Sequence, residues 1–450
     1  MNFSGEDVCH IVAMPFPGRG HINPMLSLSK FLISRKPNNI LITFVVTEEW
    51  LGFIGSDPKP KSVRYATIPN VVPPEREKTI DSFPQFYEAA ITKMEAPFEQ
   101  LLDQLELPVN VIVGDVELRW PVDVGNRRNI PVASLWTMSA SFYSMLHHLE
   151  VFSRHQHLTH DKLENIPEIS SVHMEDLRTV VRRNDQPTMQ LALECISEVN
   201  KANYLLLTTV QELEAETIDT LKSIFPFPIY PIGPAVPYLE LEEKISTNSN
   251  HSHDYIKWLD SQPAESVLYI SFGSFNSASS AQTDEIIEAL KNSEIRYLYV
   301  ACGETSRLKD KCGGKGMVIP WCDQLKVLSH ASIGGFWSHC GWNSTLEAVF
   351  SGVPILTFPL AYDQFPNSTQ IVDEWKNGWK VEKSSKLESD VFFAKEDMEE
   401  LVKRFMDLES QEGKKIRDRA RELRIMCGKA ICKGGSSDRN LDAFISDISS

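Results

Sequence analysis

Short apolar runs alternate with amphipathic stretches along the first third of the chain. The runs have the length and the β-branched content of buried strands, and they lie at 10–16, 40–46, 63–68, 109–114 and 131–136. The stretches at 23–35 and 83–105 repeat apolar residues at helical spacing on one face. Alternation of strands and helices predicts an α/β fold with a parallel, doubly wound sheet.

A polar stretch at 236–253 interrupts this pattern, and its turn-forming residues are typical of a linker. Beyond it the alternation restarts, with strands expected at 266–272, 296–301, 317–319, 333–336 and 354–357 and helices at 282–291, 343–350 and 364–375. Two more helical patterns, 395–408 and 412–427, close the chain. We therefore predict two Rossmann-like, doubly wound domains at 1–240 and 241–450, with the last helix able to pack back on the N-terminal domain.

Charge and hydropathy indicate which classes of partner to expect and where in the cell the protein lies. The chain has 450 residues, with 45 Lys and Arg against 61 Asp and Glu, for a net charge of -16. An acidic protein repels phosphate backbones and anionic lipids, so nucleic acid is not expected as a partner. The longest apolar run is far shorter than the ~20 residues that span a bilayer, and the acidic N-terminus lacks the features of a secretory signal. We expect a cytoplasmic protein without membrane insertion, and a monomer.

The eight cysteines include no C-x-x-C pair and no cluster with histidine at zinc-binding spacing. This usage predicts reduced thiols and no metal site. No phosphate-binding loop is present, and the glycine pair at Gly18 and Gly20 lacks the third glycine of a dinucleotide-binding fingerprint. A simple dehydrogenase is therefore disfavoured, as is a nicotinamide-dependent epimerase.

Two residues at the expected carboxyl edge of the first sheet are candidates for acid–base chemistry. His21 follows the first strand, just before a helix expected to start near residue 23, and its pKa range suits a general base. Asp115 ends the fourth strand and is placed to orient His21. The alternatives remain open: His21 could bond only to backbone, and Asp115 could cap a helix starting near Leu118.

The densest group of polar and aromatic residues occupies 321–364, a block of 44 residues. The loop at 338–342 leads into a helix expected at 343, whose N–H groups and dipole would attract a diphosphate. Trp321 offers a flat face to a base, although a buried core position is its alternative. Glu347 could bind ribose or complete a capping box with Ser344. Asp363 could bind sugar hydroxyls together with Gln364, or cap the following helix.

This block resembles the plant secondary-product glycosyltransferase signature, the donor-binding motif of plant UDP-dependent glycosyltransferases. The matching positions are Trp321, Gln324, His330, His339 to Ser344, Glu347, Gly352 to Pro354, Asp363 and Gln364. Its Trp-Cys-Asp-Gln opening is most similar to the eighty-seven family of these enzymes. The resemblance extends to the segments around His21 and around Ser274.

The resemblance implies a GT-B arrangement, two facing domains with the active site in the cleft between them. His21 would be the base and Asp115 its partner. Trp321 would stack on uracil, Gln324 and Glu347 would bind ribose, and Trp342 would join Asp363 and Gln364 at the sugar. The implied donor-binding residues are Ser274, Trp321, Cys322, Asp323, Gln324, His339, Gly341, Trp342, Asn343, Ser344, Glu347, Tyr362, Asp363 and Gln364. Asp323 stands where many relatives have proline, and relatives vary at Tyr362.

The residues and the resemblance together predict an inverting glycosyltransferase. It would transfer glucose from UDP-glucose to a hydroxyl or carboxyl of a small hydrophobic plant metabolite or hormone, with no cofactor and no metal ion. A degenerate member of the same fold that only binds a UDP-sugar or small ligand is the alternative. The acceptor is not readable from the sequence. Four apolar residues near the expected site, Phe16, Trp136, Phe142 and Met145, are candidates for its pocket, and helix core is the competing interpretation for most of them.

Overall fold

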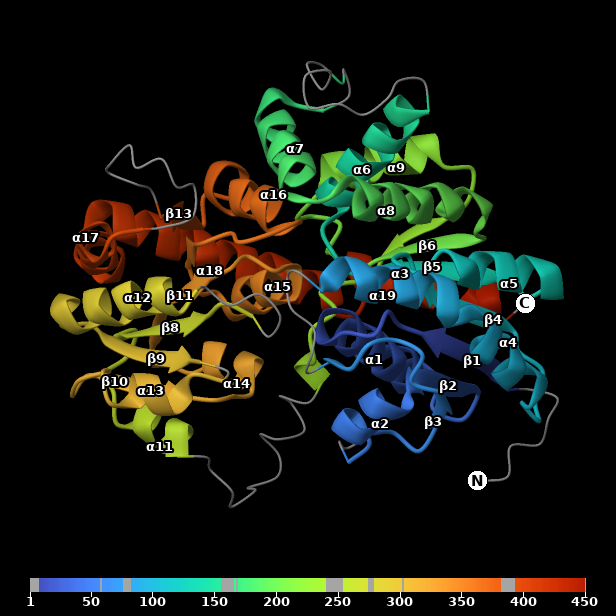
Figure 1. Ribbon diagram of the computed structural model, residues 1–450, viewed down its shortest axis with the longest axis horizontal. Helices are drawn as coiled ribbons and strands as arrows, with labels where there is room; N and C mark the ends of the chain where they lie inside the picture. Colours follow the sequence, from blue (N-terminus) through green and yellow to red (C-terminus); the bar gives the residue numbers. More distant parts are fainter. Residues whose placement is uncertain are drawn as a thin grey trace. The chain divides into compact units, whose positions relative to one another are not determined.

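The computed structural model describes residues 8–449 except 57–58, 76–81, 155–165, 167–168, 240–253, 274–278, 302 and 382–392. The chain divides into two compact units (Figure 1). Unit 1 comprises Met1–Val236 together with Lys429–Ser450, and unit 2 comprises Pro237–Gly428. Most of the linker expected at 236–253 lies outside the described residues. Each unit is built on one parallel sheet, so the predicted α/β class with two Rossmann-like domains is confirmed.

Unit 1 contains a seven-stranded sheet in the order β3-β2-β1-β4-β5-β6-β7. Its strands are β1 (Cys9–Met14), β2 (Ile40–Thr47), β3 (Val63–Ile68), β4 (Val111–Asp115), β5 (Val132–Trp136), β6 (Tyr204–Leu207) and β7 (Ile229–Pro231). The helices are α1 (Arg19–Arg35), α2 (Glu48–Ile54), α3 (Phe83–Lys93), α4 (Glu95–Asp103), α5 (Trp120–Arg128), α6 (Ala140–Ser153), α7 (Ser171–Arg183), α8 (Gln186–Glu198), η3 (Val199–Lys201), α9 (Ala215–Ile224) and α19 (Ser436–Ile448).

Unit 2 contains a six-stranded sheet in the order β10-β9-β8-β11-β12-β13. Its strands are β8 (Val267–Ser271), β9 (Arg296–Val300), β10 (Gly316–Ile319), β11 (Ile333–Ser338), β12 (Ile355–Thr357) and β13 (Gly378–Lys380). The helices are α11 (Asp254–Asp260), α12 (Ser280–Ser293), α13 (Thr305–Lys309), α14 (Gln324–Leu328), α15 (Trp342–Ser351), α16 (Gln364–Thr369), the π-helix η4 (Gln370–Glu374), α17 (Lys395–Met406) and α18 (Gln411–Ile431), which runs on into unit 1.

Burial explains why apolar runs become the central strands. Every residue of β1, β2, β4 and β5 in unit 1, and of β8 and β11 in unit 2, is buried. A parallel strand covered by helices on both faces needs apolar side chains at nearly every position rather than at alternate ones. The two hydrophobic cores therefore form around these strands.

Three predicted helices differ from the structure. α1 begins at Arg19 and contains Pro24, because the N–H groups of His21 and Ile22 already bond to the Gly18 carbonyl. The expected helix at 83–105 is divided at Met94 into α3 and α4. The expected helix at 364–375 changes to π geometry after Thr369, where Trp375 N–H bonds to the Gln370 carbonyl.

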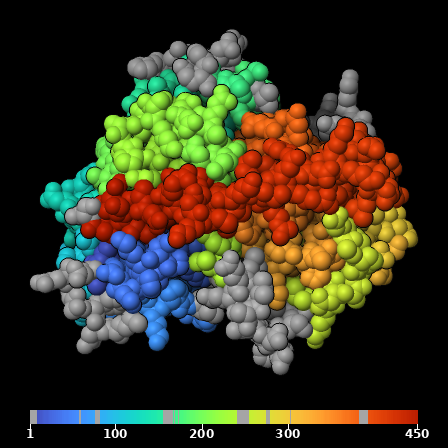
Figure 2. Space-filling model, turned by 180° about the vertical axis from the view of Figure 1, so that it is seen from behind, coloured from blue at the N-terminus to red at the C-terminus, as the bar shows by residue number. Residues whose placement is uncertain are grey.

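The final helix, α19, was not predicted from the sequence. It packs within unit 1 against α1 and β7, and the view from behind shows red residues of the chain's C-terminal end between blue and green parts of unit 1 (Figure 2). Phe444 contacts the rings of Tyr204 and Tyr230, and Asn440 donates to the Pro231 carbonyl at 2.7 Å. Arg35 of α1 pairs with Asp438.

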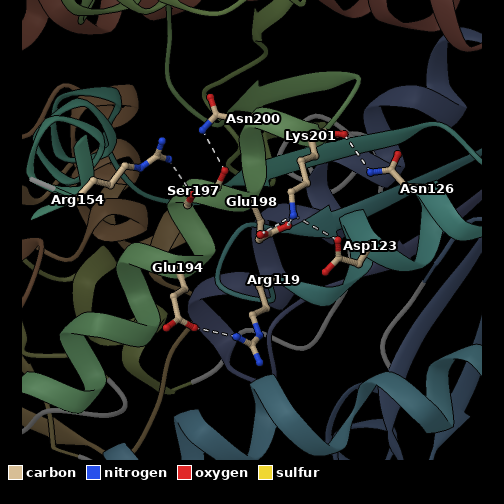
Figure 3. Close-up of polar contacts among 9 residues, drawn as sticks. All are labelled: Arg119, Asp123, Asn126, Arg154, Glu194, Ser197, Glu198, Asn200 and Lys201. Atoms are coloured by element: carbon tan, nitrogen blue, oxygen red, sulfur yellow. Dashed lines mark hydrogen bonds and ion pairs between the residues drawn. The ribbon is translucent and has the colours of Figure 1, made fainter. Parts of the chain in front are cut away.

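Polar contacts hold the segment that follows β4. Arg119 pairs with Glu194 of α8 at 2.7 Å (Figure 3). Lys201 of η3 pairs both with Glu198 of α8 and with Asp123 of α5. Exposed ion pairs of this kind each contribute about 0–1 kcal/mol. The contacts tie α5 to α8 and η3, next to the strand that carries Asp115.

No described helix is both long enough and apolar enough to cross a bilayer.

Candidate functional site

The first candidate site lies at the carboxyl edge of the sheet in unit 1. Strand order reverses between β1 and β4, and open α/β sheets bind ligands beside such a reversal. Three neighbouring strands, β1, β4 and β5, each deliver one polar side chain to this edge. His21 follows β1 in the first turn of α1, Asp115 ends β4, and Thr137 follows β5.

His21 is paired with a buried carboxylate. Its Nδ1 lies 2.9 Å from Asp115 Oδ2 and 3.0 Å from Thr137 Oγ1. The Asp115 side chain is 1% exposed, whereas that of His21 is 21% exposed. An Nδ1–H that donates to Asp115 leaves Nε2 as the proton acceptor, which is the tautomer a general base requires. The structure therefore brings the two predicted residues together in the arrangement expected of a base and its partner.

Backbone N–H groups fix the Asp115 carboxylate. Oδ1 accepts from the Glu117 N–H at 3.0 Å, and Oδ2 accepts from the Phe16 N–H at 3.3 Å. Helix α5 starts only at Trp120 and has no side-chain cap, so the helix-capping alternative for Asp115 is wrong. Asp115 instead organises the turn between its own strand and that helix.

The second candidate site lies at the matching reversal in unit 2, between β8 and β11. His339 follows β11, and its ring lies against two glycines. A Cβ atom would come within 2.7 Å of His339 Nε2 at Gly273 and within 2.5 Å at Gly341. Both positions therefore require glycine, and Gly273 also has a φ of +86°. Burial lowers the pKa of His339 to about 4, so the ring is neutral at pH 7.

Helix α15 begins directly after this loop. Gly341 is its N-cap residue, the helix has no side-chain cap, and its first turn contains no acidic residue. Its positive dipole end is thus not neutralised by a carboxylate from the first turn, which suits an anion such as a diphosphate. Ser344 lies inside the helix rather than at its N-cap, so the capping-box alternative for Ser344 and Glu347 is wrong.

A hydrogen-bonded network joins α14 to α15. Gln324 Nε2 donates to Glu347 Oε2 at 2.6 Å and to Ser344 Oγ at 2.9 Å, while Tyr269 donates to Gln324 Oε1 at 3.0 Å. Burial raises the pKa of Glu347 to about 7, against the opposing effect of the Gln324 hydrogen bond. The two predicted ribose-binding residues, Gln324 and Glu347, are therefore in direct contact.

The start of the 321–364 block combines exposed and buried residues. Trp321 is 60% exposed, so the core alternative is wrong and its ring is accessible for stacking. Cys322 is buried with its thiol 3.3 Å from the Tyr269 hydroxyl. Asp323 caps α14 by accepting from the Lys326 N–H at 3.3 Å, a local role that leaves its predicted place in the donor site untested.

Asp363 and Gln364 lie at the start of α16. Asp363 occupies the N-cap position but makes no capping bond, and its Oδ2 accepts from Asn367 Nδ2 at 2.7 Å. Gln364 Oε1 accepts from the backbone N–H groups of Leu360 and Ala361 at 2.8 and 3.0 Å. Because the oxygen is used in this way, the amide nitrogen is the atom that can donate to a ligand. Tyr362, with a φ of 52°, bends the chain before them.

The remaining predicted residues have less defined places. Ser274 lies outside the described residues. Trp342 opens α15, is buried, and contacts the Trp375 ring at 6.0 Å. Asn343 is the second residue of α15. The four acceptor-pocket candidates, Phe16, Trp136, Phe142 and Met145, are all buried, and their lining role stays a prediction. The Phe16 ring lies 5.0 Å from that of His21.

Sequence reasoning missed three residues that contact the predicted ones: Thr137, Tyr269 and Asn367. Thr137 directly follows a predicted strand, and a polar residue there is a recognisable signal. Tyr269 lies within a strand and Asn367 within a helix, where nothing in the pattern marks them. Among the described residues, no three histidine, cysteine or acidic side chains gather as metal ligands would.

Comparison with known proteins places these two sites in a family context. The sequence model described as UDP-glucoronosyl and UDP-glucosyl transferase matches residues 180–407. UDP-glycosyltransferase 87A1 of Arabidopsis thaliana is 48% identical over 97% of this chain and 99% of its own length.

Two solved structures share the fold over 98% of this chain, each with 27% sequence identity and a TM-score of 0.81. One is Medicago truncatula UGT71G1 complexed with UDP-glucose, 99% of which is covered. The other is Phytolacca americana UGT2 complexed with UDP-2fluoro-glucose and pterostilbene, 100% of which is covered.

Proposed function

Because this chain belongs to the plant UDP-glycosyltransferase family and is an enzyme of that family, we propose that it transfers glucose from UDP-glucose to a small hydrophobic plant metabolite or hormone. The acceptor atom would be a hydroxyl or carboxyl oxygen, and the anomeric configuration would invert. The observation that carries the proposal is the 2.9 Å contact between His21 Nδ1 and buried Asp115. A protein that had lost turnover would have no need of an oriented base at this edge.

The proposed chemistry is a single displacement. His21 Nε2 removes the proton of an acceptor hydroxyl as that oxygen attacks the anomeric carbon opposite UDP. Asp115 keeps the Nδ1 proton in place and stabilises the imidazolium that forms. The C–O bond to UDP breaks with its electron pair on the diphosphate, so an α-linked donor gives a β-glucoside.

The leaving diphosphate would be stabilised by unit 2. The dipole end of α15 and its first N–H groups favour an anion, and neutral His339 can donate one hydrogen bond. We expect no metal ion to be required for this charge. Removing divalent cations with a chelator should therefore leave the initial rate unchanged, and a rate restored only by added Mg²⁺ would refute this part of the proposal.

Glucose is the proposed sugar because Asp363 and Gln364 offer an acceptor and a donor for hydroxyls. No arginine occurs between residues 338 and 380 to bind a uronate carboxylate. Competition among UDP-sugars tests this choice. A higher kcat/KM with UDP-glucuronate or UDP-galactose than with UDP-glucose would make the sugar assignment wrong.

Product analysis tests the function as a whole. The purified protein is incubated with UDP-glucose and a panel of plant phenolics, terpenoids and hormones, and glucosides are identified by mass and by the anomeric coupling in NMR spectra. We expect β-glucosides of small hydrophobic acceptors, in line with the pterostilbene bound in the Phytolacca relative. Tight UDP-glucose binding without any product would favour a binding protein instead. The cytoplasmic location and the monomeric state stay predictions.

A further inference from the structure

Asn367 joins two parts of unit 2 that the proposed donor site requires. Its side chain is completely buried in α16, one turn after Asp363. Asn367 Nδ2 donates to Asp363 Oδ2 at 2.7 Å and to the Cys340 carbonyl at 2.9 Å. One amide group therefore spans from the sugar-site carboxylate to the loop that precedes α15.

The chemistry of the partners fixes the orientation of this amide. A carboxylate oxygen and a backbone carbonyl oxygen only accept hydrogen bonds, so the NH2 group must face both of them. With the amide flipped, its oxygen would face two acceptors and both bonds would be lost. Each of the two N–H bonds of Asn367 thus has one acceptor.

The loop end of this bridge has an unusual conformation. Cys340 has a φ of 67°, in the left-handed region that residues other than glycine seldom occupy. Such a conformation persists only when surrounding contacts hold it. Ser338 Oγ accepts from the Cys340 N–H at 3.0 Å, and Asn367 binds the Cys340 carbonyl, so both polar backbone groups of this residue are held.

We propose that Asn367 is a positioning residue that sets the place and orientation of the Asp363 carboxylate relative to the loop at 338–341. The inference rests on the proposed function, in which Asp363 receives sugar hydroxyls. Asn367 itself touches no substrate. It acts on the sugar through Asp363, and the Cys340 carbonyl is its anchor.

The test compares UDP-glucose with UDP, which lacks the sugar. Asn367→Asp keeps the size of the side chain and removes the NH2 donor, and Asn367→Ser is a second variant that avoids a buried charge. We expect the Kd of UDP-glucose to rise roughly tenfold, as for one lost charge-assisted hydrogen bond, with a much smaller change for UDP. Isothermal titration calorimetry measures both. Equal losses for the two ligands would overturn the proposal.

Asn377 provides the matched control. It is also a completely buried asparagine of unit 2, and within the described part of the chain its side-chain atoms have no hydrogen-bond partner. Asn377→Asp measures what burying a new carboxyl does to the thermal midpoint. We expect Asn377→Asp to leave the ratio of UDP-glucose affinity to UDP affinity unchanged. If that ratio fell as much as in Asn367→Asp, the effect would be a general result of destabilisation.

A double-mutant cycle separates positioning from a structural role. In the Asp363→Asn background, Asn367→Ser should change UDP-glucose affinity little, because the carboxylate that it positions is gone. The same fold-change in both backgrounds would show that Asn367 acts independently of Asp363, against the proposal. Failure of the proposed function is distinguishable, since the unmodified protein would then give no glucoside before any variant is compared.

Discussion

The two sheets repeat one topology but place different chemistry at the same point. In unit 1 the strand order reverses between β1 and β4, and in unit 2 it reverses between β8 and β11. Each reversal has a histidine close to it, His21 after β1 and His339 after β11. His21 faces the buried carboxylate of Asp115, whereas the His339 ring lies against two glycines.

This difference shows that the fold supplies the position and the neighbours decide the role. A carboxylate beside Nδ1 stabilises the protonated imidazole, as a base needs when it takes up a proton. Burial without a charged partner disfavours protonation and keeps His339 neutral. In the proposed function, unit 1 would therefore carry proton transfer and unit 2 would recognise the donor.

The largest expected effect is on the base. His21→Ala should lower kcat by ~10²–10⁴, because a positioned general base contributes about that much. UDP affinity should be unchanged, since the proposed role of His21 involves the acceptor alone. The rate loss should shrink for acidic phenols, which need less help in losing a proton. Steady-state kinetics with a phenol and an aliphatic alcohol, together with calorimetry of UDP binding, check these points.

His339→Ala is the counterpart in unit 2, and it should mainly raise the Kd of UDP. If the two variants gave the same pattern of kinetic and binding defects, the division of roles between the units would be wrong. Near-normal turnover of an alcohol by His21→Ala would show that another group is the base.

A smaller loss is expected when the partner of the base loses its charge. Asp115→Asn keeps the shape of the side chain but no longer stabilises the imidazolium. The value of kcat should fall, and the acidic limb of the kcat/KM profile should move to lower pH because the unpaired histidine deprotonates more easily. A pH–rate profile measures the shift. An unchanged limb, or one moved to higher pH, would contradict the pairing of Asp115 with His21.

Much of the fold was predictable because parallel strands buried on both faces leave continuous apolar runs. Ten predicted strands correspond to β1–β5 and β8–β12 within a few residues at each end. The short strands β6, β7 and β13 were not predicted, whereas the equally short β10 and β12 were, so runs of three or four residues are an unreliable signal. Helix α1 was predicted to start near residue 23, but it starts at Arg19, because the Ile22 N–H already bonds to the Gly18 carbonyl.

The candidate site was predictable where residues follow strands or form a dense block. His21 and Asp115 were predicted as a pair because their strands end at one sheet edge, and the structure places them 2.9 Å apart. Contacts between distant residues within elements were not predictable, as with Tyr269 and Gln324. The alternatives for Glu347 and Trp321 were decided only by the actual helix start and by exposure.

Loss of the Glu347 carboxylate in unit 2 should have a smaller effect than loss of His21 or of the Asp115 charge in unit 1. Glu347→Gln or Glu347→Ala should weaken UDP binding by ~1–3 kcal/mol through lost charge-assisted hydrogen bonds to ribose. Because the pKa of Glu347 is raised to about 7, the carboxyl ionises as the pH rises through that value, and only the ionised form accepts strongly from hydroxyls. UDP affinity of the unmodified protein should therefore increase from pH 6 to pH 8.

The Glu347→Gln protein is also the control for this pH dependence. UDP has a phosphate that titrates near pH ~6, and the variant retains that contribution while lacking the carboxyl. The difference between the two affinity curves should isolate Glu347. If UDP affinity changed with pH equally in both proteins, ionisation of Glu347 would not affect UDP binding. An unchanged Kd of UDP with a lower thermal midpoint would show that Glu347 has only a structural role.

The smallest expected effect concerns acid stability, and it distinguishes the two histidine environments once more. The pKa of His339 falls from 6.5 to about 4 in the folded protein, so between these values the unfolded chain binds a proton that the folded chain does not. The free energy of unfolding contributed by this group is therefore complete above pH 6.5 and is lost as the pH falls toward 4. His339→Gln, which cannot titrate, should reduce the fall in thermal midpoint over that window by a few degrees.

His147 of α6 provides a control, because burial lowers its pKa to about 4 as well. His147→Gln should therefore also reduce the fall in thermal midpoint at acid pH, while UDP affinity stays unchanged. Differential scanning calorimetry from pH 4 to pH 7 measures both slopes. An undiminished slope in His339→Gln would show that this imidazole titrates normally and is not the neutral donor that distinguishes unit 2 from unit 1.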